Sequence, residues 1–231
     1  MILASSGSTK TNTVAANTFH TFNFDATTLP QWKADLAAFS TLISAAAAPD
    51  GVGETALLKW FGASAERIAL LAYVIHGIVP THVARELTIG DFRADFGWAE
   101  VDPAVDATVG LIELENCEPR TLFEKKKRKA PYLGARFLGG FGQLVDWCAF
   151  GQAQARADAA ISLILGSQHA NASYVFALVA GDRRFANDAL SQNRLQWWRE
   201  NMQVGHGTTT MTFDLLLQSG QRKLQILSSA K

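Results

Sequence analysis

The stretch TVGLIELEN, residues 108–116, decides the fold of this chain because its alternating apolar and polar residues predict a β-strand. Two further strand candidates come just before it, VARELTI at residues 83–89 and FRADFGW at residues 92–98. Turn residues separate the three runs. We therefore predict an antiparallel meander.

The strand predicted over residues 108–116 carries two carboxylates on one face. Successive side chains of a strand point to opposite faces, so Glu113 and Glu115 point the same way, about 6 to 7 Å apart. On a dry face each charge would raise the pKa of the other, and the pair would need a cation or a basic group nearby. An edge strand with one face in water is the alternative, and it needs no special role for these carboxylates.

Helices and two more strands surround the predicted meander. The predicted helices cover residues 28–48, 54–62, 66–78, 134–165, 188–202 and 214–220. The additional strands are SYVFALVAG at residues 173–181, apolar enough to be buried on both faces, and TTTMTF at residues 208–213. Residues 1–28, rich in Ser, Thr and Asn, predict a loosely packed leader. This order of elements predicts an α/β (α+β) fold in which helices flank one central sheet.

Composition narrows the class of protein. The chain has 231 residues, of which 48% are hydrophobic and 18% charged, as is typical of a packed globular protein. Basic and acidic residues number 21 each, so any attraction to nucleic acid or to an acidic membrane must be local. Cys117 and Cys148 are too few for a disulfide framework. Because the sequence has neither a signal peptide nor a run that could span a bilayer, we expect a cytoplasmic protein without a membrane partner.

A third carboxylate is expected beside the first two. If the strand over residues 92–98 pairs with the strand over residues 108–116, Asp95 lies next to Glu113 across the ladder. Asp95, Glu113 and Glu115 then meet at one end of the sheet. Clusters of oxygen ligands suit Mg²⁺ or Mn²⁺, and such ions polarise phosphodiesters and activate water.

The long helix predicted next adds a polar group and unusual glycines. Gln143 and Trp147 are four residues apart and share a helix face. Gly139, Gly140 and Gly142 each cost about 1 kcal/mol of helix stability relative to Ala, which indicates close approach of another backbone or of a ligand. Gln143 either hydrogen-bonds a metal-bound water, a carboxylate or a phosphate oxygen, or it is a packing amide satisfied by backbone.

Taken in order, these segments resemble the nuclease domain of the Shedu anti-phage defence proteins, which belong to the PD-(D/E)xK phosphodiesterase superfamily. The resemblance covers about residues 54–220. It implies a restriction-endonuclease-like mixed sheet in a domain over residues 53–231, with residues 1–52 as a flexible leader and N-terminal helical extension. The similar segments are ETALLKWF (54–61), ARELTIGDFRADF (84–96), IELE (112–115), QLVDW (143–147), SYVFALVAGDRR (173–184) and TMTFDLLL (210–217).

The resemblance also implies roles for individual residues. Asp95 and Glu113 would be metal ligands, and Gln143 would be the helix glutamine of the active site. Glu115 stands where the superfamily usually has a lysine that orients water and stabilises charge on the phosphate. Glu115 would instead bind a second cation or act as a base. Glu54 is either a further acidic group at the metal or a first-turn glutamate favoured by the helix dipole.

A basic run after the meander is the candidate nucleic-acid contact, with a solvated loop as the alternative. We predict a Mg²⁺- or Mn²⁺-dependent nuclease that cuts DNA as a homo-oligomer in prokaryotic defence. Two alternatives stay open: a degenerate nuclease fold that binds nucleic acid or regulates without cutting, and an interaction protein without metal. The candidate nucleic-acid contacts in the basic run are Lys125, Lys126, Lys127, Arg128 and Lys129, with Arg183 and Arg184 as further candidates.

Overall fold

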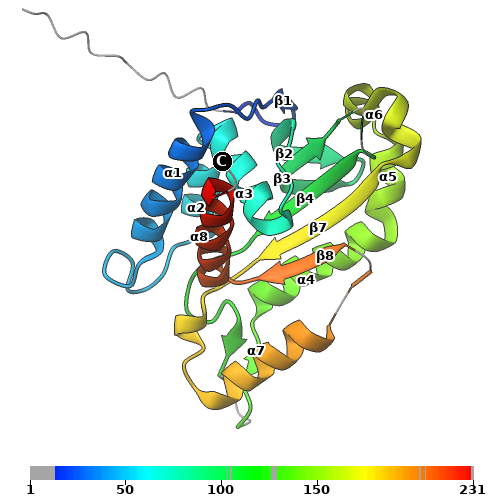
Figure 1. Ribbon diagram of the computed structural model, residues 1–231. Helices are drawn as coiled ribbons and strands as arrows, with labels where there is room; N and C mark the ends of the chain where they lie inside the picture. The colour runs from blue at the N-terminus through cyan, green and yellow to red at the C-terminus, as the bar shows by residue number, and fades with distance from the viewer. Residues whose placement is uncertain are drawn as a thin grey trace, which may run out of the picture.

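A six-stranded mixed sheet forms the centre of the computed structural model, which describes residues 14–102, 104, 106–125, 129–202, 204–205 and 207–229 (Figure 1). In spatial order its strands are β1 (His20–Thr21), β2 (His82–Ile89), β3 (Phe92–Glu100), β4 (Thr108–Leu114), β7 (Ser173–Val179) and β8 (Thr208–Met211). β2, β3 and β4 form the predicted antiparallel meander, whereas β4, β7 and β8 run parallel. A separate short ribbon pairs β5 (Phe123–Glu124) with β6 (Tyr132–Leu133).

Helices cover both faces of the sheet, which confirms the predicted α/β fold (Figure 1). None of the helices in the described residues combines the length and the apolar character that crossing a bilayer requires. One face carries α1 (Thr28–Ile43), α2 (Glu54–Phe61), α3 (Ala65–His76) and α8 (Phe213–Ser229). The other carries α4 (Ala135–Asp146), the π-helical turn η1 (Trp147–Gly151), α5 (Gln152–Ala157), α6 (Ala159–Leu165) and α7 (Ala189–Asn201).

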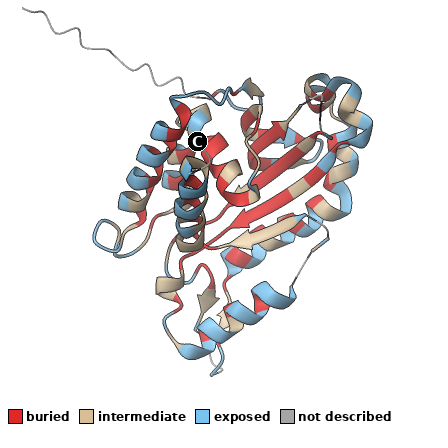
Figure 2. Cartoon of the chain, in the orientation of Figure 1, coloured by how far each residue is buried: buried red, intermediate tan, exposed pale blue. Residues whose placement is uncertain are grey.

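The strand that carries the two glutamates lies in the middle of the sheet. β7 pairs with β4 from Thr108 to Leu114, so the alternative of an edge strand with one wet face is wrong. Ile112 packs into the core on the α1 and α8 side, whereas Leu111 packs on the α4 side. Figure 2 shows this central part of the sheet as buried. Glu113 shares the face of Leu111 and therefore extends toward α4.

The prediction of one continuous helix over residues 134–165 is wrong. After α4 the chain makes the π-helical turn η1, and it leaves the helical path at Asp158, where ψ is 127°. The Asp158 carboxylate accepts hydrogen bonds from the N–H groups of Ala160 and Ile161, at 2.9 and 3.0 Å, and caps α6. Capping by an aspartate satisfies the first N–H groups of a new helix, so it favours a second helix start over a continuous helix.

The last helix is longer than predicted. α8 continues past Gly220 to Ser229. A Cβ on Gly220 would lie 2.9 Å from Leu36 Cδ1 of α1. This glycine therefore permits close packing of two helices and does not end α8.

Residues 14–27, which precede α1, pack against the rest of the fold. Val14 and Phe22 are buried, β1 pairs with β2, and the Phe22 ring stacks on Trp32 with 6.0 Å between centroids. This part of the leader predicted over residues 1–28 therefore belongs to the packed fold, and residues 1–13 lie outside the described residues. The predicted boundary between residues 52 and 53 stays a prediction.

Candidate functional site

Asp95 and Glu113 meet where β3 and β4 reach the same end of the sheet. The pairing of Phe96 with Ile112, continued by one residue, places Asp95 opposite Glu113. The Asp95 carboxylate reaches across and accepts the N–H of Leu114 at 2.8 Å. The predicted neighbourhood of these two carboxylates is confirmed, and their role stays a prediction.

An irregularity in β2 accompanies this arrangement. The β2–β3 pairing is interrupted between Arg85–Phe96 and Leu87–Ala94, at Glu86. Glu86 has a φ of 51°, which a residue with a side chain rarely adopts. Strained backbone of this kind is often found at functional sites. Here the strained residue, Glu86, lies on β2, the strand beside Asp95 of β3.

Glu115 continues the same face and is 9% exposed. α4 packs closely over it, since a Cβ on Gly140 would lie 3.1 Å from Glu115 Cγ. Glu113 Oε2 and Glu115 Oε2 are both buried and have no hydrogen-bond donor among the described residues. Buried carboxylate oxygens without a donor are unfavourable unless a proton or a cation neutralises them.

Glu54, at the start of α2, adds a fourth carboxylate. Glu54 lines the same open cleft as Asp95 and Glu113, and its charge raises the pKa values of Asp95, Glu113 and Glu115. The Glu54 N–H donates to Asn116 Oδ1 at 3.0 Å, which fixes the start of α2 beside the end of β4. Glu54 therefore begins α2 and also lies near the other carboxylates, and its role as a further acidic group at a metal stays a prediction.

Burial is the first cause of the raised pKa values in this cluster. It raises the pKa of Asp95 to about 6, against the opposing effect of the Leu114 N–H. Burial, with the charges of Asp95, Glu115 and Glu54, raises the pKa of Glu113 to about 9. The pKa of Glu115 rises to about 7 through burial and Glu54, opposed by Arg136. Carboxylates perturbed in this way bind protons or cations near neutral pH.

An open cleft of about 570 Å³, the carboxylate cleft, gives access to Asp95 and Glu113. The turn between β2 and β3 forms one wall and α4 forms the other. Acidic side chains predominate in its lining, so its field favours cations. The lining residues are Glu54, Asp91, Phe92, Arg93, Asp95, Glu113, Leu138, Gly139, Gly142, Gln143 and Asp146.

Gln143 lies in the wall of the carboxylate cleft, but its amide is engaged. Its Nε2 donates to the backbone carbonyl of Arg93 at 2.7 Å. The structure thus favours the alternative of a packing amide satisfied by backbone. Gln143 holds α4 against β3 and so positions one wall of the cleft.

The helix glycines differ in what surrounds them, and this gives a stability prediction. A Cβ on Gly140 would lie 2.6 Å from Leu178 Cδ1, whereas a Cβ on Gly142 would meet no atom within 4 Å. We expect Gly140→Ala to destabilise the protein by about 1–3 kcal/mol through overpacking. Gly142→Ala should stabilise it by about 1 kcal/mol. Urea unfolding in EDTA measures both changes, and a Gly140→Ala variant as stable as Gly142→Ala would contradict the packing argument.

The basic run does not line the carboxylate cleft in its described part. Lys125 Nζ is 3.9 Å from Asp188 Oδ2, beside the start of α7, and Lys129 is exposed. Lys126, Lys127 and Arg128 lie outside the described residues. Their predicted contact with DNA stays a prediction.

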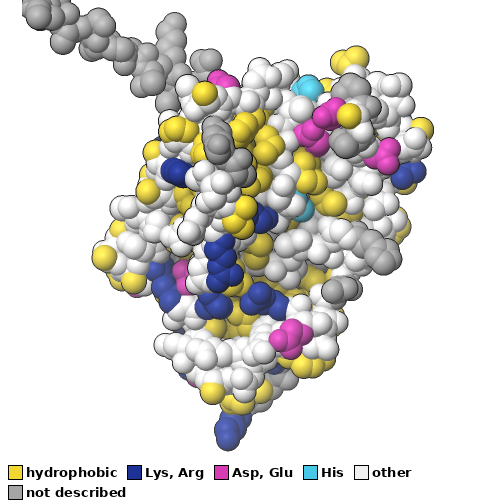
Figure 3. Space-filling view, in the orientation of Figure 1, with side chains coloured by type: hydrophobic (Ala, Val, Ile, Leu, Met, Phe, Trp, Pro, Cys, Tyr) yellow, Lys and Arg dark blue, Asp and Glu magenta, His cyan; other side chains and the backbone are white. Residues whose placement is uncertain are grey.

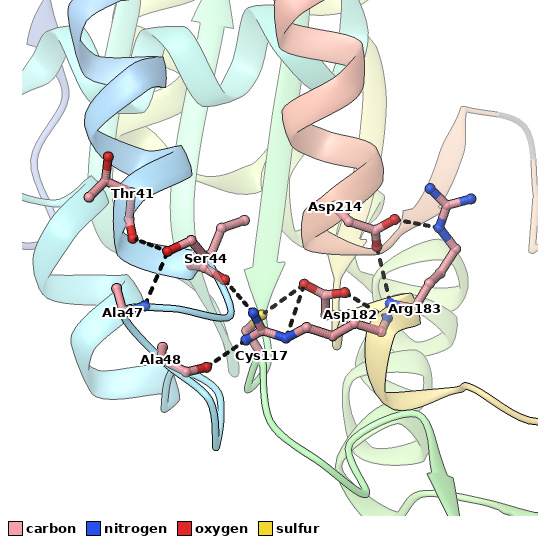
Figure 4. A network of polar contacts seen from close by, with 10 residues as sticks. Thr41, Ser44, Ala47, Ala48, Cys117, Asp182, Arg183 and Asp214 are labelled. Atoms are coloured by element: carbon pink, nitrogen blue, oxygen red, sulfur yellow. Dashed lines mark hydrogen bonds and ion pairs between the residues drawn. The ribbon is translucent and has the colours of Figure 1, made fainter.

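The two arginines after β7 are engaged in structural contacts, of which Figure 4 shows that of Arg183 with Asp214. Arg183 forms an ion pair with Asp214 at the start of α8. Arg184 donates to the carbonyl of Ile43 at 2.7 Å and to that of Ala48 at 2.9 Å, and so ties the turn to the end of α1. These contacts hold both arginines within the fold, and Arg184 Nε lies 3.8 Å from Asp182 Oδ2 without a hydrogen-bond partner among the described residues.

A larger cleft, of about 980 Å³, lies on the other side of α4, between α7 and β8. Lys and Arg side chains gather near the hollow between α7 and α8 in Figure 3. The charges that line this cleft balance: Arg183, Arg184 and Arg199 with Asp182, Asp214 and Glu200. Because unpartnered buried carboxylate oxygens are found at Glu113 and Glu115 instead, the smaller carboxylate cleft is the better candidate site.

Arg136 is a site residue that the sequence reasoning missed. It lies in the first turn of α4, its Nη1 is 3.4 Å from Glu54 Oε2, and its charge lowers the pKa of Glu115. A cation in the first turn of a helix is opposed by the helix dipole. This unfavourable position of Arg136 was the feature of the sequence that could have identified it as a site residue.

Comparison of the chain with protein-family models and with curated proteins gave no match. The resemblance to the Shedu nuclease domain stays a prediction that rests on the segments quoted above.

Proposed function

We propose that the chain is a Mg²⁺- or Mn²⁺-dependent nuclease of the Shedu type that hydrolyses DNA phosphodiester bonds in prokaryotic anti-phage defence. The observation that carries the proposal is the pair Asp95 and Glu113 on neighbouring strands, with a buried Glu113 oxygen that has no donor among the described residues. The cytoplasmic location and the homo-oligomer belong to the same proposal.

The donor set fits a hard divalent cation that keeps part of its water shell. Among the described residues, no group of three or more acidic, histidine or cysteine side chains is arranged to hold a metal ion. Mg²⁺, however, is usually bound by one or two carboxylates together with water and substrate phosphate. Asp95 and Glu113 meet that requirement, and Glu115 and Glu54 add negative charge around them.

The bound cation would polarise the phosphodiester and lower the pKa of a coordinated water. Asp95 is oriented for this by the Leu114 N–H. Glu115, with a pKa of about 7, is suited to accept the proton of the attacking water. The water oxygen bonds to phosphorus, a P–O ester bond breaks, and the leaving oxygen takes a proton from solvent.

Arg136 supplies a cation near the place where the superfamily has lysine. Its side chain is 62% exposed at the rim of the cluster, beside Glu54 and close enough to lower the pKa of Glu115. A guanidinium is suited to bind phosphate oxygens in pairs. In this proposal Arg136 stabilises the charge that develops on the phosphate.

A nuclease fold that binds without cutting is the second candidate. Glu115 in the lysine position and the equal numbers of acidic and basic residues favour it. Such a protein would bind the cation and DNA but leave the strands intact.

Cation binding and DNA cleavage separate these functions. We expect the wild type to bind Mg²⁺ or Mn²⁺ in calorimetry and to cut plasmid, linear or single-stranded DNA. Asp95→Asn should weaken cation binding and reduce cleavage by about 100-fold or more. Asp106→Asn is the matched control, because Asp106 is exposed at the other end of the β3–β4 hairpin.

Each outcome of this comparison decides something. Cation binding without cleavage of any DNA would support the binding module. Absence of cation binding by the wild type, or equal binding by Asp95→Asn, would reject the metal site.

A further inference from the structure

A second cleft meets the carboxylate cleft at Asp95. This cleft, of about 720 Å³, lies between α2 and the β2–β3 hairpin, and Asp95 lines both clefts. We call it the aromatic cleft, because Trp60 lines it together with Lys59, Arg67 and Arg85. The carboxylate cleft is acidic, whereas the aromatic cleft combines the rings of Trp60 and Phe96 with three cations and two carboxylates, Glu86 and Asp95.

Trp60 and its neighbours form a surface of the kind that binds nucleobases. The Arg67 guanidinium lies over the Trp60 ring, 4.3 Å from its centroid. Arg67 is fixed in this place by Asp35 Oδ1 at 2.9 Å and by the Trp60 carbonyl at 3.1 Å. Aromatic and guanidinium planes beside cations are what proteins use to stack the bases of single strands.

Arg85 carries a buried donor without an acceptor beside the aromatic cleft. Its Nε is buried and has no hydrogen-bond partner among the described residues, while Nη2 is 3.1 Å from Glu86 Oε1. Gly62 makes room for the Arg85 side chain, since a Cβ there would lie 2.6 Å from Arg85 Cδ. A buried unpaired N–H is unfavourable, so a ligand with an oxygen acceptor would relieve it.

We infer that the aromatic cleft receives a nucleobase of the strand being cut, so that the substrate is DNA that is unpaired at the site of hydrolysis. This inference rests on the proposed nuclease function and specifies its substrate class. The phosphate at Asp95 and Glu113 is linked to a nucleotide whose base lies against the stacked pair of Arg67 and Trp60. A base in a duplex is stacked and paired, and it enters a side cleft only after leaving the helix.

The size of the aromatic cleft is consistent with this occupant. Pockets for small organic ligands have volumes of about 300–1,000 Å³, and the aromatic cleft falls in that range. Arg67 and Arg85 are paired with Asp35 and Glu86, so the exposed Lys59 is the cation best placed to meet backbone phosphates, while the carboxylate cleft requires a divalent cation before it can accept phosphate. The two clefts therefore divide the nucleotide between them, the base on one side of Asp95 and the scissile phosphate on the other.

Binding of a short phosphorothioate-linked oligothymidylate, which resists hydrolysis, tests the inference. Fluorescence anisotropy in Mg²⁺ should show that Trp60→Leu weakens its binding by roughly 5- to 150-fold, the range that loss of one stacked base predicts. Trp60→Phe, which keeps a ring, should bind within about threefold of the wild type. A blunt hairpin duplex should bind equally to all three proteins.

Trp60 also packs on Phe39, with 4.9 Å between the ring centroids, so Trp60→Leu can lower the yield of folded protein. Substitutions of two surface lysines therefore provide a second test that leaves the core unchanged. Lys59 and Lys33 are both exposed on helices, and Lys59 alone of the two lines the aromatic cleft. We expect Lys59→Ala to weaken oligothymidylate binding and to make that binding less dependent on salt concentration. Lys33→Ala should change neither the affinity nor its salt dependence.

The outcomes distinguish this inference from the proposed function. If Trp60 variants alter oligothymidylate binding but the wild type cuts no DNA, the nuclease proposal fails and the base site stands. If the wild type cuts blunt duplex as fast as single strands, and if Trp60→Leu and Lys59→Ala bind the oligothymidylate normally, the base site is wrong and the nuclease proposal survives.

Discussion

Glu113→Gln is expected to abolish Mg²⁺-dependent cleavage while making the metal-free protein more stable at alkaline pH. Glutamine keeps the shape of the side chain but removes a charge that lies near Asp95, Glu115 and Glu54. Loss of an anionic metal ligand should reduce cleavage by about 10³-fold or more, since the cation supplies several kcal/mol of transition-state stabilisation. The substitution also removes a buried carboxyl group that has to ionise as the pH rises.

The two effects have different pH dependences. The pKa of Glu113 is raised to about 9, so at pH 7 the metal-free protein already carries a proton there and glutamine changes little. At pH 9 and above, the variant should unfold at a higher temperature than the wild type in EDTA. Active-site groups are often held at a cost in stability, so a loss of activity together with a gain in stability is the result expected for a functional carboxylate.

A matched substitution and a clear contrary result complete this test. Glu200→Gln, in an exposed position on α7, should change neither cleavage nor stability. If Glu113→Gln cuts DNA at the wild-type rate, the cation is not held at Glu113. If the variant is inactive but also less stable than the wild type at pH 9, the Glu113 charge supports the fold and the metal site is unsupported.

The sequence was sufficient to predict how Asp95 and Glu113 meet, for a simple physical reason. Strand alternation has a period of two, so once residues 92–98 and 108–116 are recognised as a hairpin, the faces follow directly. The observed pairing of Phe96 with Ile112 places both carboxylates as predicted. Local pattern and tertiary structure agree in this hairpin because its strands are neighbours in the chain.

Contacts between distant segments could not be predicted in the same way. Whether β4 is an edge strand depends on its pairing with β7, and whether its Glu113 face is wet depends on α4, which packs over that face. Glu54 and Arg136 reach the cluster from the first turns of two helices, α2 and α4. The break at Asp158 reflects a competition between a cap and a continuous helix that the apolar pattern does not reveal.

In EDTA, the stability of the wild-type protein is expected to fall between pH 7 and pH 9, and Mg²⁺ should reverse that fall. Glu113 and Glu115 have pKa values of about 9 and 7 in the folded protein, far above the ordinary glutamate pKa of about 4.3. The folded state therefore binds more protons than the unfolded state in this window. The free energy of unfolding decreases as the pH rises.

The window is chosen so that other groups contribute little. Burial lowers the pKa of His76 to about 4, so its effect, a gain of stability with pH, is complete by about pH 7. Burial raises the pKa of Cys117 to about 12, so Cys117 adds to the fall only at the upper end of the window, near the ordinary thiol pKa of about 8.5 to 9, and it does so equally in Glu113→Gln. Within this window, each proton that the folded state binds in excess of the unfolded state lowers the free energy of unfolding by about 1.4 kcal/mol per pH unit.

Thermal unfolding at pH 7, 8 and 9, with EDTA or with Mg²⁺, measures this linkage. We expect a loss of about 2 to 3 kcal/mol across the window in EDTA. Because the cation replaces the protons on Glu113 and Asp95, the stabilisation by Mg²⁺ should increase with pH. Glu113→Gln should flatten the EDTA profile and reduce the response to Mg²⁺. An EDTA profile that is flat in the wild type would mean that these carboxylates ionise without cost, and a Mg²⁺ response independent of pH would place the cation elsewhere.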